Sequence, residues 1–567
     1  MPSRSLRKVL LIQPPAFSNN GRTDMNPNLP LGIAYIAAVL EREGYGVTML
    51  DAFIEGWNQE TRITDEKILV GLPYPDIKKA IAAVAPDVVG ITSMFTSQRK
   101  NAHAVAALAK EVNPKTFVVM GGAHPTAAPE TVLADPNVDF VVMGEGDNTI
   151  GPLLECLADG GDLATIDGIV YRNANGQLVN QKKTRQVEDL DSLPFPARHL
   201  LPMEKYFAAG VRHGGYSQDK RATSVITSRG CQYYCNFCTA FMVFTRKPRM
   251  RSAANVIAEL EELVNRYGVT EVFFEDDQFL AHQKRTEELL EEMARKFTLK
   301  FDTPNGISAW ILNDRVLEKM KAAGCYRVNL AIESGNQDVL DKIINKPVKV
   351  DKIPGIAAMI RKHGMELGTF IVAGNIGHAG IETLEQVRDS FKLARRIRVR
   401  PHVSYLTPYP GSEVLEVART NGFLAPDFDW DDLVITSQCI DTPEWTREEL
   451  HRFVERERVK THLWIWLTQP HRLIERVAQH IRRSPWVFVL SIGRTVREIS
   501  RVVWSDENGR QRARPIAAMA PPAKAIEAKP VSFHHAAQAS APGKVIYPLS
   551  VASGDGQLSS EAATRPH

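Results

Sequence analysis

Short apolar runs rich in β-branched residues alternate with longer amphipathic stretches through the first part of the chain. The runs begin at Val9, Val47, Val88, Phe117 and Phe140. Between them, residues 31–42 and 104–112 repeat apolar positions at the spacing of one helix face. Continuous apolar strands separated by helices are typical of a parallel sheet that is covered on both faces. We therefore predict that residues 1–157 form a doubly wound, Rossmann-like α/β domain.

The same alternation resumes after a connecting segment. Residues 158–222 combine a hairpin pattern at 168–178 with a proline-rich crossing, which predicts a connector between domains. From residue 223 to residue 425 strand and helix patterns alternate again, as in a parallel barrel or part of one. The pattern of residues 426–510 favours a mainly helical region, and the composition of residues 511–567 predicts a disordered tail.

Small and polar residues follow the predicted strands of the first domain. Ser93 comes after the third strand, Gly121, Gly122 and His124 after the fourth, and the run Gly-Glu-Gly at 144–146 after the fifth. Parallel sheets bind ligands at the carboxyl ends of their strands, so these loops predict a ligand site. No GxGxxG motif opens the first helix, which argues against a dinucleotide as the ligand.

Composition and charge narrow the possible partners. The chain has 44% apolar and 24% charged residues and a net charge of +3, so it lacks the basic excess expected of a dedicated nucleic-acid binder. Its N-terminus runs into a strand pattern without the apolar region of a secretory signal. Residues 461–504 combine tryptophan with arginine, a pattern that fits either an interfacial membrane element or a helical cover packed on the barrel. We expect a cytoplasmic protein, with peripheral contact at the inner face of the membrane if the first interpretation holds.

Three cysteines within eight residues carry the clearest chemical signal. Cys231, Cys235 and Cys238 have the spacing CxxxCxxC, whereas the other three cysteines of the chain are scattered singly. A structural zinc site needs four ligands in paired spacings, and no second pair lies nearby. An iron–sulfur cluster held by three thiolates keeps one iron open for chemistry. Such a cluster also requires a reducing compartment.

The cysteine motif resembles the signature of radical S-adenosylmethionine (SAM) enzymes, and residues 7–425 as a whole resemble the cobalamin-binding members of that family. The second resemblance rests on Pro14-Pro15 after the first strand, the helix opening Leu29-Pro-Leu-Gly, and the Gly-Gly-x-His and Gly-Glu-Gly loops. It implies a cobalamin domain, a six-unit partial (β/α)6 barrel, and three cofactors: one 4Fe–4S cluster, SAM and cobalamin. An electron donor such as flavodoxin or ferredoxin is the implied protein partner.

The resemblance also assigns candidate residues. Ser93, Gly121 and Gly122 would make room for the nucleotide tail of cobalamin, and His124 is a candidate contact. In the barrel, Phe237 would pack near the SAM adenine or shield the cluster, and Asp277, Glu333 and Ser334 would contact SAM. Asp277 could instead cap the next helix. The candidates are therefore Ser93, Gly121, Gly122 and His124 for cobalamin, Phe237, Asp277, Glu333 and Ser334 for SAM, and Cys231, Cys235 and Cys238 for the cluster.

The chain departs from its relatives at two places. The D-x-H-x-x-G stretch that puts a histidine on cobalt elsewhere is absent, so we expect no histidine ligand to cobalt. The usual Gly-x-Pro-Gly-Glu-Thr loop reads Gly374-Asn-Ile-Gly-His378, unless a longer loop supplies Glu382 and Thr383 as the missing pair. His378 is then either an acid or base of the reaction or a solvated loop residue. Tyr405 is a second candidate that could face substrate or pack in the core.

These observations predict an enzyme that generates a 5′-deoxyadenosyl radical and functionalises an unactivated carbon. We expect C-methylation of a lipid, tetrapyrrole or natural-product intermediate, with oxidative cyclisation without methyl transfer as the alternative. A methylthiotransferase acting on RNA would carry three further cysteines in the first domain, where only Cys156 occurs. A non-catalytic cobalamin or redox sensor would have no need of an open iron.

Overall fold

The computed structural model describes residues 6–19, 21, 25–64, 67–210, 217–424 and 428–469. The predicted tail, 511–567, and all but the start of the segment rich in tryptophan and arginine lie outside these residues. None of the described helices is long and apolar enough to cross a membrane.

The first domain is built on a sheet in the order β10-β9-β8-β7-β6-β1-β3. The five strands β3, β1, β6, β7 and β8 run parallel, which confirms the doubly wound α/β prediction. The hairpin predicted within the connector adds β9 and β10 to this sheet as antiparallel strands, so this part of the connector belongs to the first domain's sheet. The strands are β1 (Lys8–Gln13), β3 (Gly46–Asp51), β6 (Val88–Thr92), β7 (Phe117–Gly121), β8 (Phe140–Val142), β9 (Ile169–Arg172) and β10 (Leu178–Gln181).

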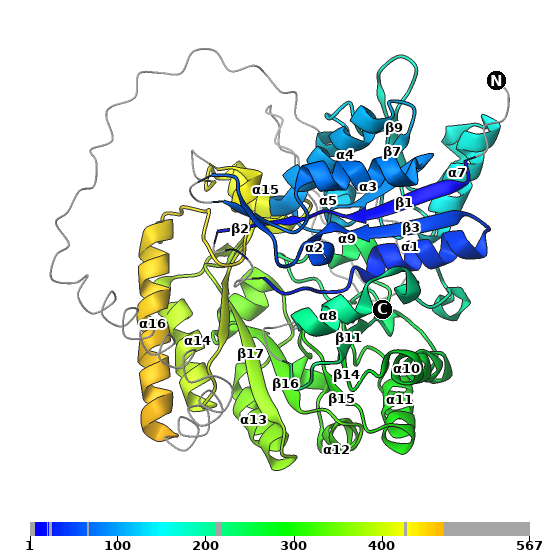
Figure 1. The fold of residues 1–567 in the computed structure, drawn as a ribbon. Helices are drawn as coiled ribbons and strands as arrows, with labels where there is room; N and C mark the ends of the chain where they lie inside the picture. The colour runs from blue at the N-terminus through cyan, green and yellow to red at the C-terminus, as the bar shows by residue number, and fades with distance from the viewer. Residues whose placement is uncertain are drawn as a thin grey trace, which may run out of the picture. The chain divides into compact units, whose positions relative to one another are not determined.

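Helices cover both faces of this sheet (Figure 1). Alternate strand residues divide the core: Leu11 packs with α1 (Leu31–Arg42) and α7 (Ile150–Asp159), whereas Leu10 packs with α3 (Tyr74–Val84) and α4 (Arg99–Val112). Because both faces are buried, the strands could not alternate between apolar and polar residues, which explains their continuous apolar runs. Shorter pieces of this domain are β2 (Ala16–Ser18), α2 (Ala52–Glu55), β4 (Glu60–Arg62), β5 (Ile68–Val70), α5 (Ala123–Ala127) and α6 (Pro129–Val132).

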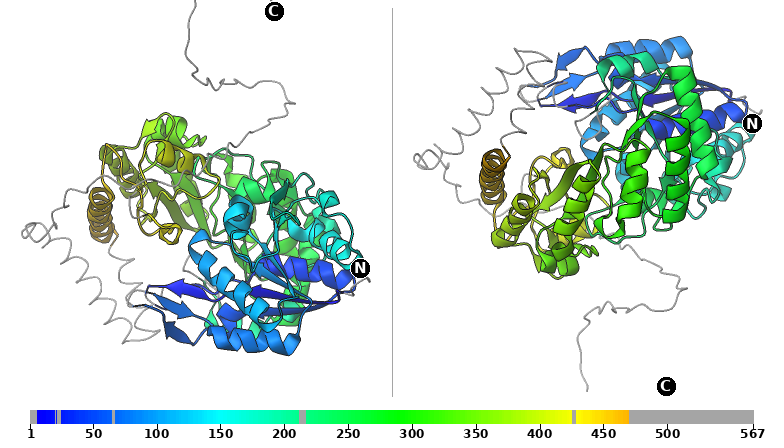
Figure 2. Two further views of the ribbon diagram at one scale, coloured as in Figure 1. Left: turned by 90° about the horizontal axis from the view of Figure 1, so that it is seen from above. Right: turned by 90° about the horizontal axis from the view of Figure 1, so that it is seen from below.

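The second domain contains six parallel strands, each followed by a helix, as the partial-barrel prediction requires. They form two three-stranded sheets, β11-β14-β15 and β16-β17-β20, and the bridge between Ile307 and Leu330 joins the halves. Figures 1 and 2 show the helices along the outside of these strands. The strands are β11 (Ala222–Val225), β14 (Glu271–Phe274), β15 (Lys300–Asp302), β16 (Arg327–Glu333), β17 (Glu366–Ala373) and β20 (His402–Tyr405). The helices are α10 (Ala253–Tyr267), α11 (Gln283–Lys296), α12 (Asp314–Ala322), α13 (Ile353–Lys362), α14 (Leu384–Arg396) and α15 (Glu413–Thr420).

Beyond the barrel, the long helix α16 (Arg447–Thr468) lies along α14 (Figure 1). It begins with a capping box in which the Thr446 hydroxyl accepts from the Glu449 N–H and the Glu449 carboxylate accepts from the Thr446 N–H. Thr442, four residues before this cap, closes a turn with Trp445. The start of the segment rich in tryptophan and arginine therefore continues a helix packed on the barrel, with Ile465 buried against its surroundings.

Candidate functional site

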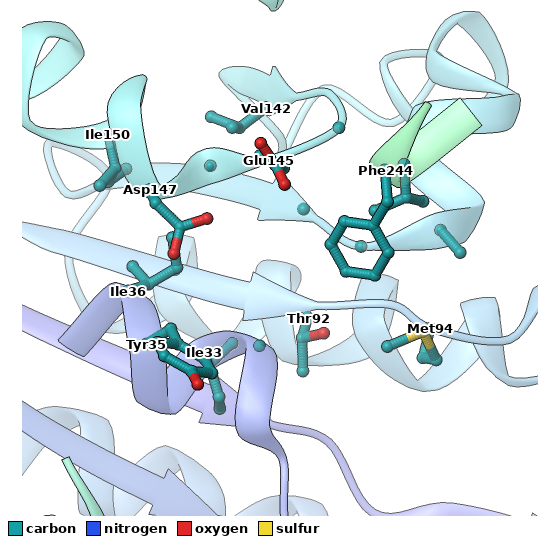
Figure 3. A pocket seen from close by; sticks show the side chains of 18 of the residues that line it. Ile33, Tyr35, Ile36, Thr92, Met94, Val142, Glu145, Asp147, Ile150 and Phe244 are labelled. Atoms are coloured by element: carbon teal, nitrogen blue, oxygen red, sulfur yellow. The ribbon is translucent and has the colours of Figure 1, made fainter. Parts of the chain in front are cut away.

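A mostly apolar cavity of about 310 Å³ lies at the carboxyl ends of β1, β6, β7 and β8. The chain adds β3 on one side of β1 and then crosses over to add β6, β7 and β8 on the other side. Doubly wound sheets bind ligands at such a switch point, which here lies between β1 and β6. Figure 3 shows Ile33, Tyr35 and Ile36 extending from α1, with Thr92 and Met94 at the end of β6. Barrel residues complete the wall, among them Ile226, Arg229 and Asp277. The cavity is therefore bounded by both domains.

Two of the four predicted cobalamin contacts line this cavity. Gly121 has room on its inner side, because an added Cβ would meet only the Val142 carbonyl oxygen at 3.6 Å. Gly122 is required by the protein itself, since its φ is +111° and a Cβ would lie 2.8 Å from the Ser93 carbonyl oxygen. Only Gly121 thus fits the predicted role of leaving space for a ligand.

Ser93 and His124 do not line the cavity. Both side chains are buried, and His124 Nδ1 lies 3.2 Å from Thr96 Oγ1. Among the described residues, neither His124 Nε2 nor Ser93 Oγ has a hydrogen-bond partner. Burial, reinforced by Arg99 and His103, lowers the pKa of His124 to about 4, so the ring is neutral at pH 7.

The three motif cysteines lie in one loop between β12 (Ser228–Arg229) and α9 (Ala240–Phe244). Each thiol is partly buried, and burial raises the pKa of Cys231 and Cys235 and raises that of Cys238 to about 11. Metal binding must therefore supply the energy that keeps them as thiolates. The loop is fixed by the Asn236 amide, which donates to the carbonyl oxygens of Ile343 and Ile376 at 2.8 Å each.

The CxxxCxxC spacing, with all three cysteines in one loop, favours a cluster over a single ion. A single zinc ion needs all its sulfurs about 2.3 Å from one point, whereas the cysteines of a cubane each bind a different iron. The remaining cysteines are poor alternatives, since Cys325 and Cys439 are buried and Cys156 packs in the core.

Strand ends of the barrel bring acids beside the cysteine loop. Asp276 accepts hydrogen bonds from Thr227 and Ser228, and Asp277 accepts from the Gly230 N–H at 3.1 Å. Burial raises the pKa of Asp277 to about 6, although the Gly230 hydrogen bond opposes this rise. Asp277 also lines the apolar cavity, so it stands between the cavity and the cysteines.

Glu333 ends β16 in a strained conformation. Its φ is +67°, a left-handed value uncommon for residues other than glycine, and the strand register shifts just before it. Its carboxylate pairs with Lys346 Nζ at 2.8 Å, and both side chains are buried. Lys346 was missed by the sequence reasoning, because nothing in the run Asn345-Lys-Pro distinguishes it from a surface lysine.

The longer-loop alternative for Glu382 is the one observed. The segment from Gly374 to Glu382 makes a small hairpin, and the Glu382 carboxylate accepts from the backbone N–H groups of Gly374 and Asn375, each at 3.0 Å. The Ser334 hydroxyl donates to the same carboxylate at 3.4 Å. Burial raises the pKa of Glu382 to about 7. Ser334 therefore helps join the ends of β16 and β17.

Neither of the two predicted catalytic candidates lines the cavity. His378 is at the exposed tip of the hairpin, where its Nε2 is 3.9 Å from Glu413. Tyr405 is buried, and its hydroxyl lies 2.9 Å from His451 Nδ1 on α16. Phe237 is half-buried and packs against two separate groups of buried apolar residues in the second half of the chain. The solvated-loop interpretation of His378 and the core interpretation of Tyr405 match these positions.

A buried group of four charges joins the two domains beside the cavity. Glu145, from the Gly-Glu-Gly loop, accepts two hydrogen bonds from Arg249 at 2.8 Å each, and Asp147 accepts from Arg229 at 2.8 and 3.2 Å. Arg229 directly precedes the cysteine loop, so this group fixes the loop relative to the first domain. Motif reading identified the Gly-Glu-Gly loop but not the arginines that pair with it.

Two family matches cover the two domains. Residues 25–154 match the B12 binding domain, and residues 225–394 match the radical SAM superfamily. The chain is 32% identical to cytidylyl-2-hydroxyethylphosphonate methyltransferase of Streptomyces wedmorensis, over 79% of this chain and 88% of the relative. It is 26% identical to the anaerobic magnesium-protoporphyrin IX monomethyl ester cyclase of Rubrivivax gelatinosus, over 72% and 69% of the two chains.

Solved structures agree with the fold. The cobalamin-dependent radical SAM enzyme OxsB aligns with a TM-score of 0.64 at 14% identity, over 89% of this chain and 71% of that one. The radical SAM methyltransferase TsrM from Kitasatospora setae, with cobalamin and a 4Fe–4S cluster bound, aligns with a TM-score of 0.58 at 17% identity, over 74% and 76%. With the cysteine loop, the cavity at the switch point and a methyltransferase relative matched along most of its length, the predicted fold, family and enzyme class are confirmed. The chain belongs to the cobalamin-dependent radical SAM methyltransferases, which use cobalamin, SAM and a 4Fe–4S cluster.

Proposed function

We propose that this protein methylates an unactivated carbon of a small polar metabolite. One observation carries the proposal: the chain matches a phosphonate methyltransferase over 88% of that relative's length at 32% identity. Its resemblance to the tetrapyrrole cyclase of Rubrivivax gelatinosus and to the hopanoid C-3 methylase of Methylococcus capsulatus is weaker, at 26% and 23% identity. A nucleotide-linked phosphonate, as in the relative's name, is therefore the first substrate class to test.

The side chains that surround Asp277 in space have the chemistry needed to hold the three cofactors. Cys231, Cys235 and Cys238 would hold the cluster, leaving one iron open. Asp277 and Glu333 offer carboxylates to the ammonium and hydroxyl groups of SAM, and Lys346 offers a cation to its carboxylate. The apolar cavity fits part of cobalamin, the rest of which would extend between the domains.

Both cofactors must reach one substrate for this chemistry. When bound, SAM reduced at the cluster supplies a radical that removes a hydrogen atom, and methylated cobalamin supplies the methyl group. Asp277 lines the cavity and also accepts from Gly230, next to Cys231, so the two cofactor regions adjoin at this side chain. Each turnover consumes two electrons, one to cleave SAM at the cluster and one to return cobalamin to the state that accepts a methyl group from a second SAM, and both would come from a protein donor such as flavodoxin or ferredoxin.

The test is anaerobic turnover with SAM that carries a deuterated methyl group. Cytidylyl-2-hydroxyethylphosphonate, a tetrapyrrole and a hopanoid would be supplied separately, and the products analysed by mass spectrometry. We expect a methylated product that carries three deuterium atoms in place of hydrogen, and is therefore about three mass units heavier than the product from unlabelled SAM, together with 5′-deoxyadenosine. The Cys235→Ala variant is the matched control and should give neither.

Each alternative has its own outcome in this experiment. A cyclase would release 5′-deoxyadenosine with a product that has lost hydrogen and gained no methyl group. A sensor would release no 5′-deoxyadenosine with any substrate. Methyl transfer to the tetrapyrrole or hopanoid alone would overturn the polar substrate class and keep the reaction.

A further inference from the structure

A second group of charges joins the first domain to the segment beyond the barrel, and we call it the carboxylate clamp. Asp431 binds Arg99 Nη1 at 2.5 Å, Lys100 Nζ at 2.6 Å and Lys67 Nζ at 2.7 Å. Asp429 binds Arg99 Nη2 at 2.9 Å and Lys100 Nζ at 3.4 Å. Two carboxylates from η11 (Trp430–Asp432) and the residue before it thus hold three cations of the first domain.

The cations of the carboxylate clamp flank loops at the switch point. Arg99 and Lys100 begin α4, directly after the short 3₁₀ helix η2 (Thr96–Gln98) that follows β6. Arg99 also donates to the Thr96 carbonyl oxygen at 3.3 Å. The Gln98 side chain makes two hydrogen bonds, of 2.7 and 3.0 Å, to the backbone of Phe17 after β1. The loops after β1 and β6 are therefore connected to each other and to the clamp.

The loop Ser93–Gln98 faces the cofactor cavity. Met94 lines the cavity, and Met94 and Phe95 are 51% and 61% exposed, unusual values for large apolar side chains. Apolar side chains exposed next to a cavity favour a bound apolar surface that would cover them. The position of this loop therefore determines which contacts a ligand makes at the carboxyl ends of the strands.

The buried charge group borders the cavity directly, whereas the carboxylate clamp acts on it only through the loop Ser93–Gln98, and the two groups differ in exposure. In the buried group, the side chains of Glu145, Asp147, Arg229 and Arg249 are at most 5% exposed. In the clamp, Asp431 is 8% exposed, but Lys67 is 37% exposed, and Asp429 and Lys100 are 50% exposed. Dissolved salt screens exposed pairs far more than buried ones. The loop held by the clamp is therefore the part of the cavity wall that is displaced more readily.

We propose that Asp429 and Asp431 are positioning residues that hold the loop Ser93–Gln98 against bound cobalamin, and that cobalamin enters and leaves on the side they close. The proposal rests on the cobalamin binding in the proposed function. The cavity of about 310 Å³ takes only part of cobalamin, which is larger than the drug-sized ligands of cavities of about 300–1,000 Å³, so the cofactor would pass on the side where the wall is displaced more readily. Opening at the clamp breaks ion pairs that water already reaches, whereas opening at the buried group would break several desolvated, hydrogen-bonded pairs at once.

The test measures how fast bound cob(II)alamin leaves the whole protein, with and without the clamp. Wild type and the double variant Asp429→Asn with Asp431→Asn are loaded with cobalamin, and release is followed by absorbance between about 0.05 M and about 0.5 M NaCl. We expect release from wild type to accelerate with salt. The double variant should release cobalamin about tenfold faster at low salt, with little further salt dependence.

Three controls separate positioning from general destabilisation. The double variant Asp338→Asn with Asp351→Asn removes two exposed carboxylates that pair with Lys342 and Lys352, so it changes the net charge equally and should leave release unchanged. Asp431→Glu keeps the charge and should restore most of the slow release. Iron content and SAM cleavage without added substrate should be equal in all variants, because the clamp does not touch the cysteine loop.

Different failures point to different parts of the argument. Release from the double variant at the wild-type rate, or wild-type release that ignores salt, would overturn the clamp and leave the proposed function intact. If the double variant does not fold, the salt dependence of wild type and the behaviour of Asp431→Glu still decide. A wild-type protein that takes up no cobalamin would instead overturn the proposed function.

Discussion

The substitution Glu145→Gln tests whether the buried charge group holds the two domains together. Glu145 is buried and accepts from both terminal nitrogens of Arg249, from Arg229 at 3.3 Å and from the Val187 N–H at 2.9 Å. Glutamine preserves the shape but offers one acceptor oxygen, and its amide hydrogens face the arginine donors. Arg249 would then be a buried cation without an anionic partner at Glu145.

Removing one partner of a buried ion pair costs about 3–5 kcal/mol, because the remaining charge stays desolvated. The lower end of that range applies here, since Arg249 still donates to the carbonyl oxygens of Val187 and Phe244. We therefore expect Glu145→Gln to lower the free energy of unfolding by about 3 kcal/mol. Replacing both partners, as Glu145→Leu with Arg249→Met, should recover most of this loss, because no charge is left unpaired.

Urea denaturation followed by tryptophan fluorescence measures the change. Glu188→Gln is the matched control, since Glu188 pairs with Lys247 at 2.8 Å but both side chains are at least 65% exposed. Such a surface pair contributes at most about 1 kcal/mol, so the control should unfold almost like wild type. If Glu145→Gln unfolds within about 1 kcal/mol of wild type, or the double variant is weaker than the single one, the reasoning from a buried charge is refuted.

Further predictions concern the cluster, a buried acid and cobalt. Cys235→Ala should lose the iron–sulfur absorbance and SAM cleavage, while Cys325→Ala should retain its iron, as measured by iron analysis. Burial raises the pKa of Glu382 from 4.5 to about 7, so the unfolded chain ionises first and stability falls as the pH rises between these values. Glu382→Gln should abolish that fall in thermal transitions recorded across the range, and an unchanged pH profile would contradict it. Because His124 is buried off the cavity with its Nδ1 engaged, electron paramagnetic resonance of bound cob(II)alamin should lack imidazole nitrogen hyperfine structure; its presence would make His124 a ligand.

The sequence predicted the fold where one local rule decides the outcome. Continuous apolar runs separated by amphipathic helices allow few arrangements other than parallel strands covered on both faces. The cysteine spacing likewise needs no tertiary information, because all three ligands come from one loop. The sequence predicted the hairpin at 168–178, but not that it pairs with β8, because local patterns do not show which strand lies at the open edge of the parallel sheet.

The roles of single residues at the cavity were harder to predict, because a glycine can be required either by its backbone conformation or by the space that a ligand needs. Gly121 and Gly122 look alike in the sequence, yet Gly122 is fixed by its own positive φ and by the Ser93 backbone, whereas Gly121 has space beside it. His124 follows them in an attractive loop, but the short helix α5 turns its ring toward Thr96. Loop composition therefore indicated where the ligand site is without identifying which side chains reach it.

The contacts between the domains lie furthest from what sequence patterns can reveal. Glu145 and Arg249 are 104 positions apart, and Asp431 and Arg99 are 332 positions apart. Each residue is an ordinary charge within its own segment, and only the packing of two independently predictable domains brings the pairs together. The Gly-Glu-Gly loop illustrates this point. Gly144, with a φ of +63°, allows the turn after β8, but Glu145 acquires its partner Arg249 only when β13 (Arg249–Met250), the strand after the cysteine loop, packs against the first domain. A motif that spans two domains can thus be recognised before its chemistry is understood, because half of the interaction is encoded elsewhere in the chain.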